Sequence, residues 1–220
     1  MKRLFSLFLL AAAVYAQAPQ TPPAASPERP NGLYAHFKTS MGDITAVLYE
    51  KDTPVTVRNF VALAQGAKPW MDPKTHTMVR RPLYNNLIFH RVMLDGMIQT
   101  GDPTGRGDHD CGFKIRDEIL PGLKFTQPGR LAMANIGEPN SGACQFFITQ
   151  ASPVTQWDGQ YTIFGQVVEG QDVVKAISRV PAVQLRPRNP PQLISVTIER
   201  VGPEPPVKNA PAKKPAPKKQ

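Results

Sequence analysis

One stretch, residues 86–102 (NLIFHRVMLDGMIQTGD), holds the side chains with the clearest chemical potential. Two apolar runs flank a DG pair, which predicts two strands joined by a tight hairpin. Alternate residues of a strand share a face, so Met97 and Gln99 are expected on one face of the second strand. If Arg91 lies on the same face of the hairpin as Met97 and Gln99, then a cation, a thioether and an amide form one patch. From the residues alone, a solvated arginine remains the alternative.

The histidine next to this arginine is expected to serve packing. Strand alternation places Phe89 and Arg91 on one face and His90 on the other. We therefore expect His90 to be a buried histidine with hydrogen-bonded ring nitrogens. The other histidines are scattered, and no spacing typical of a metal site occurs: His36, His76 and His109.

The surrounding elements indicate a mainly β domain. Alternating runs on either side of Met41–Gly42 predict a hairpin. A helix is expected from Pro54, with Thr53 as N-cap and Gly66 at its end, because apolar residues recur there at helical spacing. Further strand patterns lie at 86–93, 96–100, 130–135, 145–150, 161–168 and 192–201, a short helix at 171–178, and an exposed loop at 67–83. Many short strands with two helices favour an antiparallel barrel or sandwich.

The two ends of the chain differ in composition from its middle. Residues 1–16 combine Lys2 and Arg3 with a short apolar stretch and small residues, which is typical of a secretory signal peptide. Residues 17–30 and 203–220 hold 11 of the 24 prolines and are expected to be disordered. One domain, 31–202, remains, which is long enough for a sizeable core.

The net charge of +9 describes the ends more than the domain. The tail contributes +4 and the signal segment +2, which leaves +3 for the rest. The tail is either a solvated extension or a contact for an anionic surface such as lipid or cell wall. Nucleic acid is not expected as a partner of an exported protein, and no run inside the domain is apolar and long enough for a stable membrane span.

Four segments in order along the chain carry a family resemblance. The segments FHRV…GMIQTGDPTGRG, GRLAMANIG, CQFFIT and WDGQYTIFGQVVEG together resemble the cyclophilin-type peptidyl-prolyl isomerases. The upstream KTSMGDITAVLYEKDTPVTVRNFVALAQG is similar to the opening hairpin and first helix of that family. The resemblance covers about residues 33–201, nearly the whole domain.

The resemblance implies a fold and an activity. The fold is mainly β, a closed eight-stranded antiparallel β-barrel capped by two α-helices (cyclophilin-like). The activity is peptidyl-prolyl cis-trans isomerisation of proline-containing polypeptide segments, without nucleophile, metal or other cofactor. X–Pro bonds populate both isomers and exchange slowly, over tens of seconds or more. A donor aimed at the prolyl nitrogen binds the twisted bond better than either planar form, and arginine suits this task because it stays charged.

The resemblance also implies roles for individual residues. Arg91 takes the place of the catalytic arginine. Gln99 and the main chain of Asn135 would hold the substrate backbone, Met97 and Phe147 would line the proline pocket, and Gln145 lies near the groove.

This sequence departs from the family at three positions. Gly96 stands where the family usually has a phenylalanine that forms one wall of the proline pocket. Tyr161 takes the place of a common histidine. Because the preceding loop is one residue longer, Trp157 falls either at the family's tryptophan position or at its pocket leucine, and it could replace the wall lost at Gly96.

The two cysteines are predicted to form a disulfide. An even number of cysteines in an exported protein favours pairing. By resemblance, the segments that hold Cys111 and Cys144 flank one secondary pocket beside the groove, so the two are expected to be neighbours.

The leading functional interpretation is an exported isomerase, periplasmic or secreted, that acts as a monomer on secreted proteins. A chaperone or scaffold that binds proline peptides with little catalysis is the alternative, motivated by Gly96. A surface or wall-associated protein that depends on its basic tail is a third possibility.

Overall fold

The computed structural model describes residues 29–151 and 153–204. The predicted signal peptide, nearly all of the predicted linker, and residues 205–220 of the tail lie outside this part. The described part begins with Arg29, whose guanidinium donates to Glu169 at 3.0 Å and to Glu199 at 3.2 Å. These two ion pairs fasten the start of the domain to two strands of its sheet.

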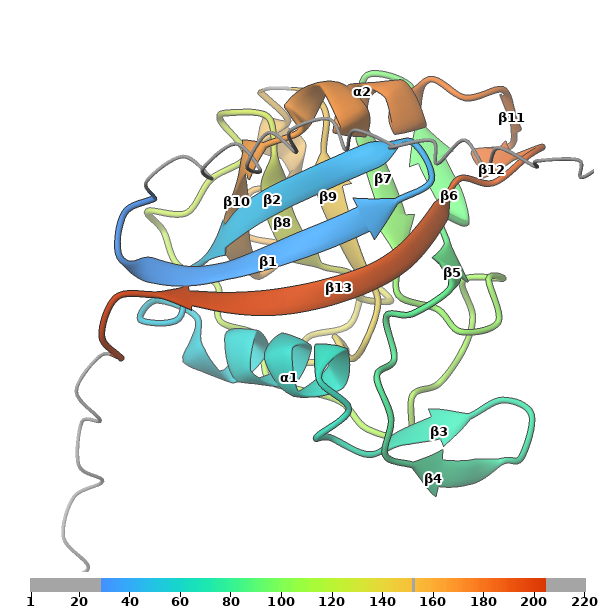
Figure 1. Ribbon diagram of the computed structural model, residues 1–220. Coiled ribbons are helices and arrows are strands. Elements are labelled where there is room, and N and C mark those ends of the chain that lie inside the picture. Colours follow the sequence, from blue (N-terminus) through green and yellow to red (C-terminus); the bar gives the residue numbers. More distant parts are fainter. Residues whose placement is uncertain (1–28, 152, 205–220) are drawn as a thin grey trace, which may run out of the picture.

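A nine-stranded sheet dominates the molecule, with two helices at opposite sides of its curl (Figure 1). Its strand order is β5-β13-β1-β2-β10-β8-β9-β7-β6. The strands span Gly32–Thr39 (β1), Gly42–Leu48 (β2), Leu87–Ile88 (β5), Arg91–Met93 (β6), Met97–Thr100 (β7), Arg130–Met133 (β8), Phe146–Thr149 (β9), Ile163–Glu169 (β10) and Gln192–Val201 (β13). The helices are α1 (Pro54–Ala64) and α2 (Gln171–Ser178), and a short 3₁₀ helix, η1, spans Thr155–Trp157.

The prediction of a closed barrel is wrong, because the sheet is open. The predicted number of eight strands is not confirmed. The segment 86–93, expected as one strand, is interrupted at Phe89 and His90. Its first half, β5, pairs with β13 and its second half, β6, pairs with β7, so the two halves form the opposite edges of the sheet. They do not pair with each other, and the sheet is a strongly curled, open half-barrel.

The main core fills the inside of this curl. Helix α1 contributes the apolar face that its sequence predicts, with Val57, Phe60 and Leu63 buried. The ring of Phe60 packs 5.3 Å from that of Phe146 and 5.2 Å from that of Phe164, centroid to centroid. Aromatic rings packed in this way bury large apolar areas and supply much of the stability of a domain of this size.

The start of α1 is capped differently from the expectation. Thr53 precedes the helix, but its side chain makes no capping bond and its hydroxyl donates to the Tyr49 carbonyl instead. The carboxylate of Glu118, far along the chain, accepts from the main-chain N–H groups of Val55 at 3.0 Å and Thr56 at 2.9 Å. This cap anchors the long segment between β7 and β8 to the helix.

The segment 67–83 is not the exposed loop that its polarity suggested. It contains a hairpin of β3 (Trp70–Asp72) and β4 (Thr77–Val79), which projects beyond the sheet (Figure 1). Trp70 is buried. Its indole N–H donates to the Arg81 carbonyl at 2.9 Å, and the Arg81 guanidinium covers its ring. A second hairpin, of β11 (Ala182–Val183) and β12 (Arg186–Pro187), was also not predicted from the sequence.

The described helices are all too short or too polar to cross a membrane.

Candidate active site

Four adjacent strands place a row of side chains on the outer face of the sheet. Arg91 of β6 lies directly opposite Gln99 of β7, which lies opposite Phe147 of β9, which lies opposite Ala132 of β8. Directly paired residues of antiparallel strands share a face. The predicted patch is thus confirmed: the faces of the two strands coincide, and Met97 joins it two residues before Gln99.

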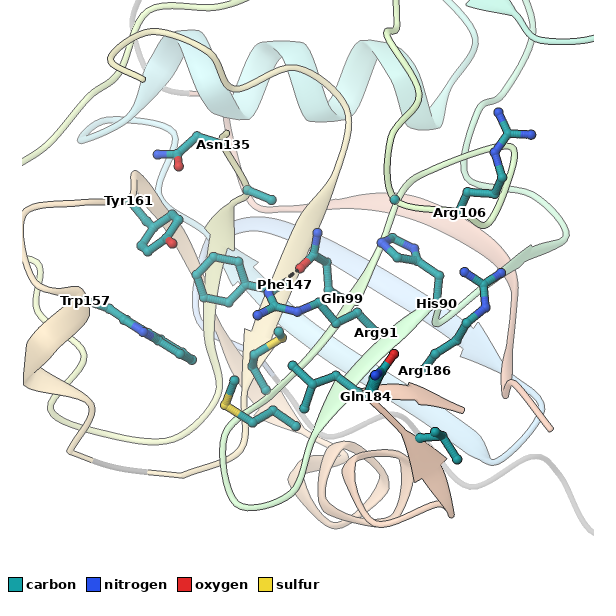
Figure 2. A pocket seen from close by; sticks show the side chains of 16 residues that line it. His90, Arg91, Gln99, Arg106, Asn135, Phe147, Trp157, Tyr161, Gln184 and Arg186 are labelled. Carbon is teal, nitrogen blue, oxygen red and sulfur yellow. Dashed lines mark hydrogen bonds between the residues drawn. The ribbon is translucent and has the colours of Figure 1, made fainter. Parts of the chain in front are cut away.

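Arg91, Gln99 and Phe147 of this row line a cavity of about 550 Å³. The predicted site residues that line it are Arg91, Met97, Gln99, Asn135, Phe147, Trp157 and Tyr161. Gln145, the remaining predicted residue, lies behind Gln99 and does not line the cavity itself. Figure 2 shows Arg91 in the middle, with Phe147, Trp157 and Tyr161 to one side of it.

A chain of amide hydrogen bonds orients Arg91. Its Nη1 donates to Gln99 Oε1 at 3.0 Å, Gln99 Nε2 donates to Gln145 Oε1 at 2.9 Å, and Gln145 Nε2 donates to the Gly107 carbonyl at 3.1 Å. The carbonyl at the end accepts only, so the donor direction of every bond in the chain is fixed. Arg91 is exposed and uses one N–H in this chain, which leaves further N–H groups facing the cavity.

An aromatic slot adjoins Arg91. The rings of Trp157 and Tyr161 meet that of Phe147 edge to face, with centroids at 5.6 Å and 5.1 Å. Phe125 stacks on Phe147 at 6.0 Å and meets the rings of Trp157 and Tyr161 edge to face. Trp157 therefore lies in the wall of the slot. Phe125 was missed, because it lies in a segment without strand or helix periodicity.

Met93 takes the space left by Gly96. A β-carbon built on Gly96 would lie 2.5 Å from both Cγ and Sδ of Met93, and Met93 also lines the cavity. The thioether is flexible and fills irregular gaps well. Met93 was not predicted as a site residue, although it lies two residues after Arg91 on the same strand and therefore shares its face.

Asn135 uses its side chain internally. Its Nδ2 donates to the Gln160 carbonyl at 2.9 Å, and its Oδ1 accepts from the Gly137 N–H at 3.1 Å. Its main-chain groups have no hydrogen bond to another described residue. This arrangement agrees with the expectation that the main chain, rather than the side chain, is available to a peptide.

His90 differs from the expectation in two ways. It is buried, with 5 % of its surface exposed, but neither ring nitrogen has a hydrogen-bond partner within the described residues. It also lines the same cavity as Arg91, because the strand is interrupted at this point and strand alternation no longer applies. Burial lowers the pKa of its imidazole. The Asp102 charge and the neighbouring side chain of Gln145 oppose that shift, and the charges of Arg186 and Arg91 add to it.

The loop above His90 is organised by one buried carboxylate. Asp102 accepts from the N–H and hydroxyl of Thr104 and from the N–H of Gly107. Burial alone would raise the pKa of Asp102, but these hydrogen bonds outweigh it and the pKa is lowered. Gly107 (φ +94°) passes so close that a β-carbon there would lie 3.3 Å from the His90 ring.

The predicted disulfide is present. Cys111 and Cys144 are bonded, with their α-carbons 6.4 Å apart and a sequence separation of 33. Both are buried. The bridge joins the end of the Asp102 loop to the segment that leads into β9, next to Gln145, and so it ties together two walls of the site.

Among the residues that the structure describes, no group of three His, Cys, Asp or Glu side chains could hold a metal ion.

Comparison with known protein families gives a match over nearly the whole domain. A family model described as "Cyclophilin type peptidyl-prolyl cis-trans isomerase/CLD" matches residues 34–202. "Peptidyl-prolyl cis-trans isomerase B" of Streptomyces anulatus is 44% identical over 169 residues, which is 77% of this chain and 95% of the relative. "Peptidyl-prolyl cis-trans isomerase A" of Mycobacterium tuberculosis is 42% identical over 167 residues, 74% of this chain and 91% of the relative.

Solved structures agree with this match. A crystal structure of a cyclophilin-type peptidyl-prolyl cis-trans isomerase of Cryptosporidium parvum, determined in the presence of the dipeptide Ala-Pro, is 29% identical. It superposes with a TM-score of 0.65 over 76% of this chain and 99% of the other.

Proposed function

Because this chain belongs to the cyclophilin-type peptidyl-prolyl cis-trans isomerases and is an isomerase of that kind, we propose that Arg91 stabilises the twisted prolyl amide in its reaction. The peptide C–N bond is partly double, with a rotation barrier of roughly 18–20 kcal/mol. Rotation breaks the conjugation and leaves a lone pair on the prolyl nitrogen. A guanidinium N–H that donates to this lone pair lowers the barrier, because the planar ground states offer no such acceptor.

The observation that carries the proposal is the position of Arg91 at the edge of the aromatic slot. A proline ring seated against Phe147 and Met97 brings its nitrogen toward the neighbouring cation. The hydrogen bond to Gln99 holds the guanidinium before substrate arrives. Such preorganised donors need little rearrangement in the transition state. Gln99 and the main chain of Asn135 hold the peptide backbone on either side.

The test is cis/trans exchange on an Ala-Pro-Phe peptide, followed by NMR with residues 17–220. Arg91→Ala should lower kcat/KM by about 10²–10³, the loss expected for one preorganised donor, while peptide affinity falls much less. Arg58→Ala is the matched control, since Arg58 is exposed on α1 outside the cavity. Slow exchange by the unmodified protein, with peptide still bound, would instead favour the chaperone or scaffold function.

Export is part of the proposal. The composition of residues 1–16 supports it, and a structural disulfide is typical of proteins outside the cytoplasm. The isomerase would then act on proline-containing segments of other exported proteins. Fractionation and N-terminal sequencing test this: a mature chain that begins at Gln17 in the periplasm or medium is expected, and a chain that begins at Met1 and stays with a cytoplasmic marker would contradict it.

A further inference from the structure

The cavity has a second half that the isomerisation chemistry does not use. On the side of Arg91 away from the aromatic slot lie His90, Arg106, Gln184 and Arg186 (Figure 2). Gly107, next to Arg106 in the chain, also lines the cavity. Arg106 and Gly107 belong to the loop that Asp102 organises, Gln184 and Arg186 belong to the β11–β12 hairpin, and His90 lies between β5 and β6. Val183 and Leu185 of the same hairpin also line the cavity, so this half combines charged and apolar side chains, whereas the slot around Phe147 has no charged side chain of its own.

The charge of the lining is one-sided. Three arginines and no Asp or Glu line the cavity. Arg186 donates to the Gly105 carbonyl at 3.1 Å, which is neutral. Arg106 pairs with Asp108 at 3.2 Å, but both side chains are 66% exposed, and such a pair contributes little. The nearby carboxylate of Asp102 is already hydrogen-bonded by its own loop.

His90 lies beneath this half of the cavity. Both of its ring nitrogens are enclosed by the protein, and Gly107 passes directly over the ring. Burial lowers the pKa of the imidazole, and the charges of Arg186 and Arg91 act on it and help to lower that pKa. A ligand in the cavity would therefore meet the arginines at the rim and not the imidazole.

The hairpin that carries Arg186 is held in an unusual conformation. Its two turn residues, Gln184 and Leu185, both have positive φ (50° and 66°), a turn that normally selects Asn-Gly. The N–H of Val92 on β6 donates to the Leu185 carbonyl at 2.8 Å and fastens the turn beside Arg91. This turn, fastened to β6, holds Arg186 at the rim of the cavity.

We propose that this half of the cavity is a subsite for an acidic side chain, Asp or Glu, within a few residues of the proline in the same peptide. Arg106 and Arg186 flank the carboxylate and donate to it from two different elements of the rim. This inference rests on the proposed function, since it adds a sequence preference to the same groove. The chain's own tail does not fit this subsite, because residues 203–220 are basic, with five lysines and one glutamate.

The experiment uses capped peptides with one Ala-Pro bond, so that a side chain is the only source of a carboxylate. Glu is placed at each other position in turn, with Gln at the same position as the matched peptide. At one position, kcat/KM for the Glu peptide should exceed that for the Gln peptide by about three- to fivefold, the upper range for a partly exposed ion pair. Raising the salt from about 20 mM to about 500 mM should reduce this ratio, because exposed charges are then screened.

For each variant, the measured quantity is the ratio of kcat/KM for the Glu peptide to that for the Gln peptide. Arg186→Gln should bring it to about one, and Arg106→Gln, which serves if the first variant fails to fold, should reduce it. Arg188→Gln is the control, because Arg188 is exposed on the same segment but does not line the cavity, and it should keep the ratio.

A ratio near one at every position, or one that survives in both Arg186→Gln and Arg106→Gln, would overturn the subsite. The same ratio is also measured as Kd by titration, so it is obtained even if turnover is slow. An active protein with a flat ratio rejects the subsite alone, whereas failure to isomerise the neutral parent peptide rejects the proposed function.

Discussion

At the scale of single residues, the direction of the Arg91 guanidinium depends on residues that do not touch a substrate. Gln145 lies at the centre of the amide chain, between Gln99 and the Gly107 carbonyl. It is therefore a positioning residue. Replacing it leaves Arg91 in place but lets Gln99 rotate, which spreads the guanidinium over several orientations.

The first prediction concerns this chain of amides. Gln145→Met should lower kcat by about two- to tenfold, corresponding to the loss of one hydrogen bond worth about 0.5–1.5 kcal/mol. KM should change little, because the aromatic slot is intact. Steady-state kinetics on the Ala-Pro-Phe peptide measures both constants, with Gln127→Met as a control on the exposed surface. A rise in KM with unchanged kcat would show that Gln145 binds substrate instead.

The second prediction concerns the wall at Gly96. Met93→Ala should weaken binding of an Ala-Pro peptide by about 1–2 kcal/mol, since it removes much of one apolar side chain from the slot. Adding Gly96→Phe to that variant should restore part of the affinity, because the ring can occupy the space that Met93 fills. Titration of the two variants tests the compensation. A double variant that binds no better than Met93→Ala would show that the two positions are not interchangeable.

At the scale of elements, strongly periodic segments were predictable and segments held by distant contacts were not. The β1–β2 hairpin, α1, α2 and the long strand β13 follow from alternation or helical spacing in the sequence. The β3–β4 hairpin depends on Trp70 packing under Arg81, and its polar sequence hid it. The interruption at Phe89–His90 comes from a change of partner strand, which local alternation cannot reveal.

The candidate site divides in the same way. Arg91, Met97 and Gln99 lie on one hairpin, so strand alternation alone brought them together. Phe147 of β9, Trp157 of η1 and Tyr161, which precedes β10, were identified by their resemblance to a family. Arg106 and Arg186 were missed, since each is a single charge in an irregular segment and only the folded chain brings them to the same rim.

The third prediction concerns the cap of α1. Glu118→Gln should lower the free energy of unfolding by about 0.5–2 kcal/mol, because a neutral amide oxygen is a weaker acceptor for the two N–H groups and loses the interaction with the helix dipole. Urea unfolding measures the change, with the exposed Glu138→Gln as control. Equal stability of the two variants would mean that the cap is replaced by water without cost.

At the scale of the whole molecule, the disulfide limits the unfolded chain more than it adds contacts. The double variant Cys111→Ala/Cys144→Ala should lose roughly 3.5–4 kcal/mol of stability, the chain-entropy value for a loop of 33 residues. Urea unfolding of this variant beside the oxidised protein tests it. An unchanged free energy of unfolding would show that the unfolded chain is already compact around this loop.

Stability should also depend on pH in two separate windows. Burial lowers the pKa of His90 in the folded protein below its ordinary value of 6.5. Below pH 6.5 His90 becomes protonated in the unfolded chain but stays neutral in the folded protein. The free energy of unfolding therefore decreases as the pH falls, by at most about 1.4 kcal/mol per pH unit. Asp102 and Glu50 have lowered pKa values, so their contribution is lost only at more acidic pH, below about 4.5.

The two windows can be separated by one substitution. His90→Gln should remove the loss of stability between about pH 6.5 and 5 and leave the loss below about pH 4.5 unchanged, because only the first depends on the imidazole. Urea unfolding at several pH values gives the slope, which is independent of whatever stability the substitution itself costs. The exposed His76→Gln is the control and should keep both windows. If His90→Gln retains the slope between pH 6.5 and 5, the buried imidazole is not its source, and His90 then takes up its proton in the folded protein as readily as in the unfolded chain.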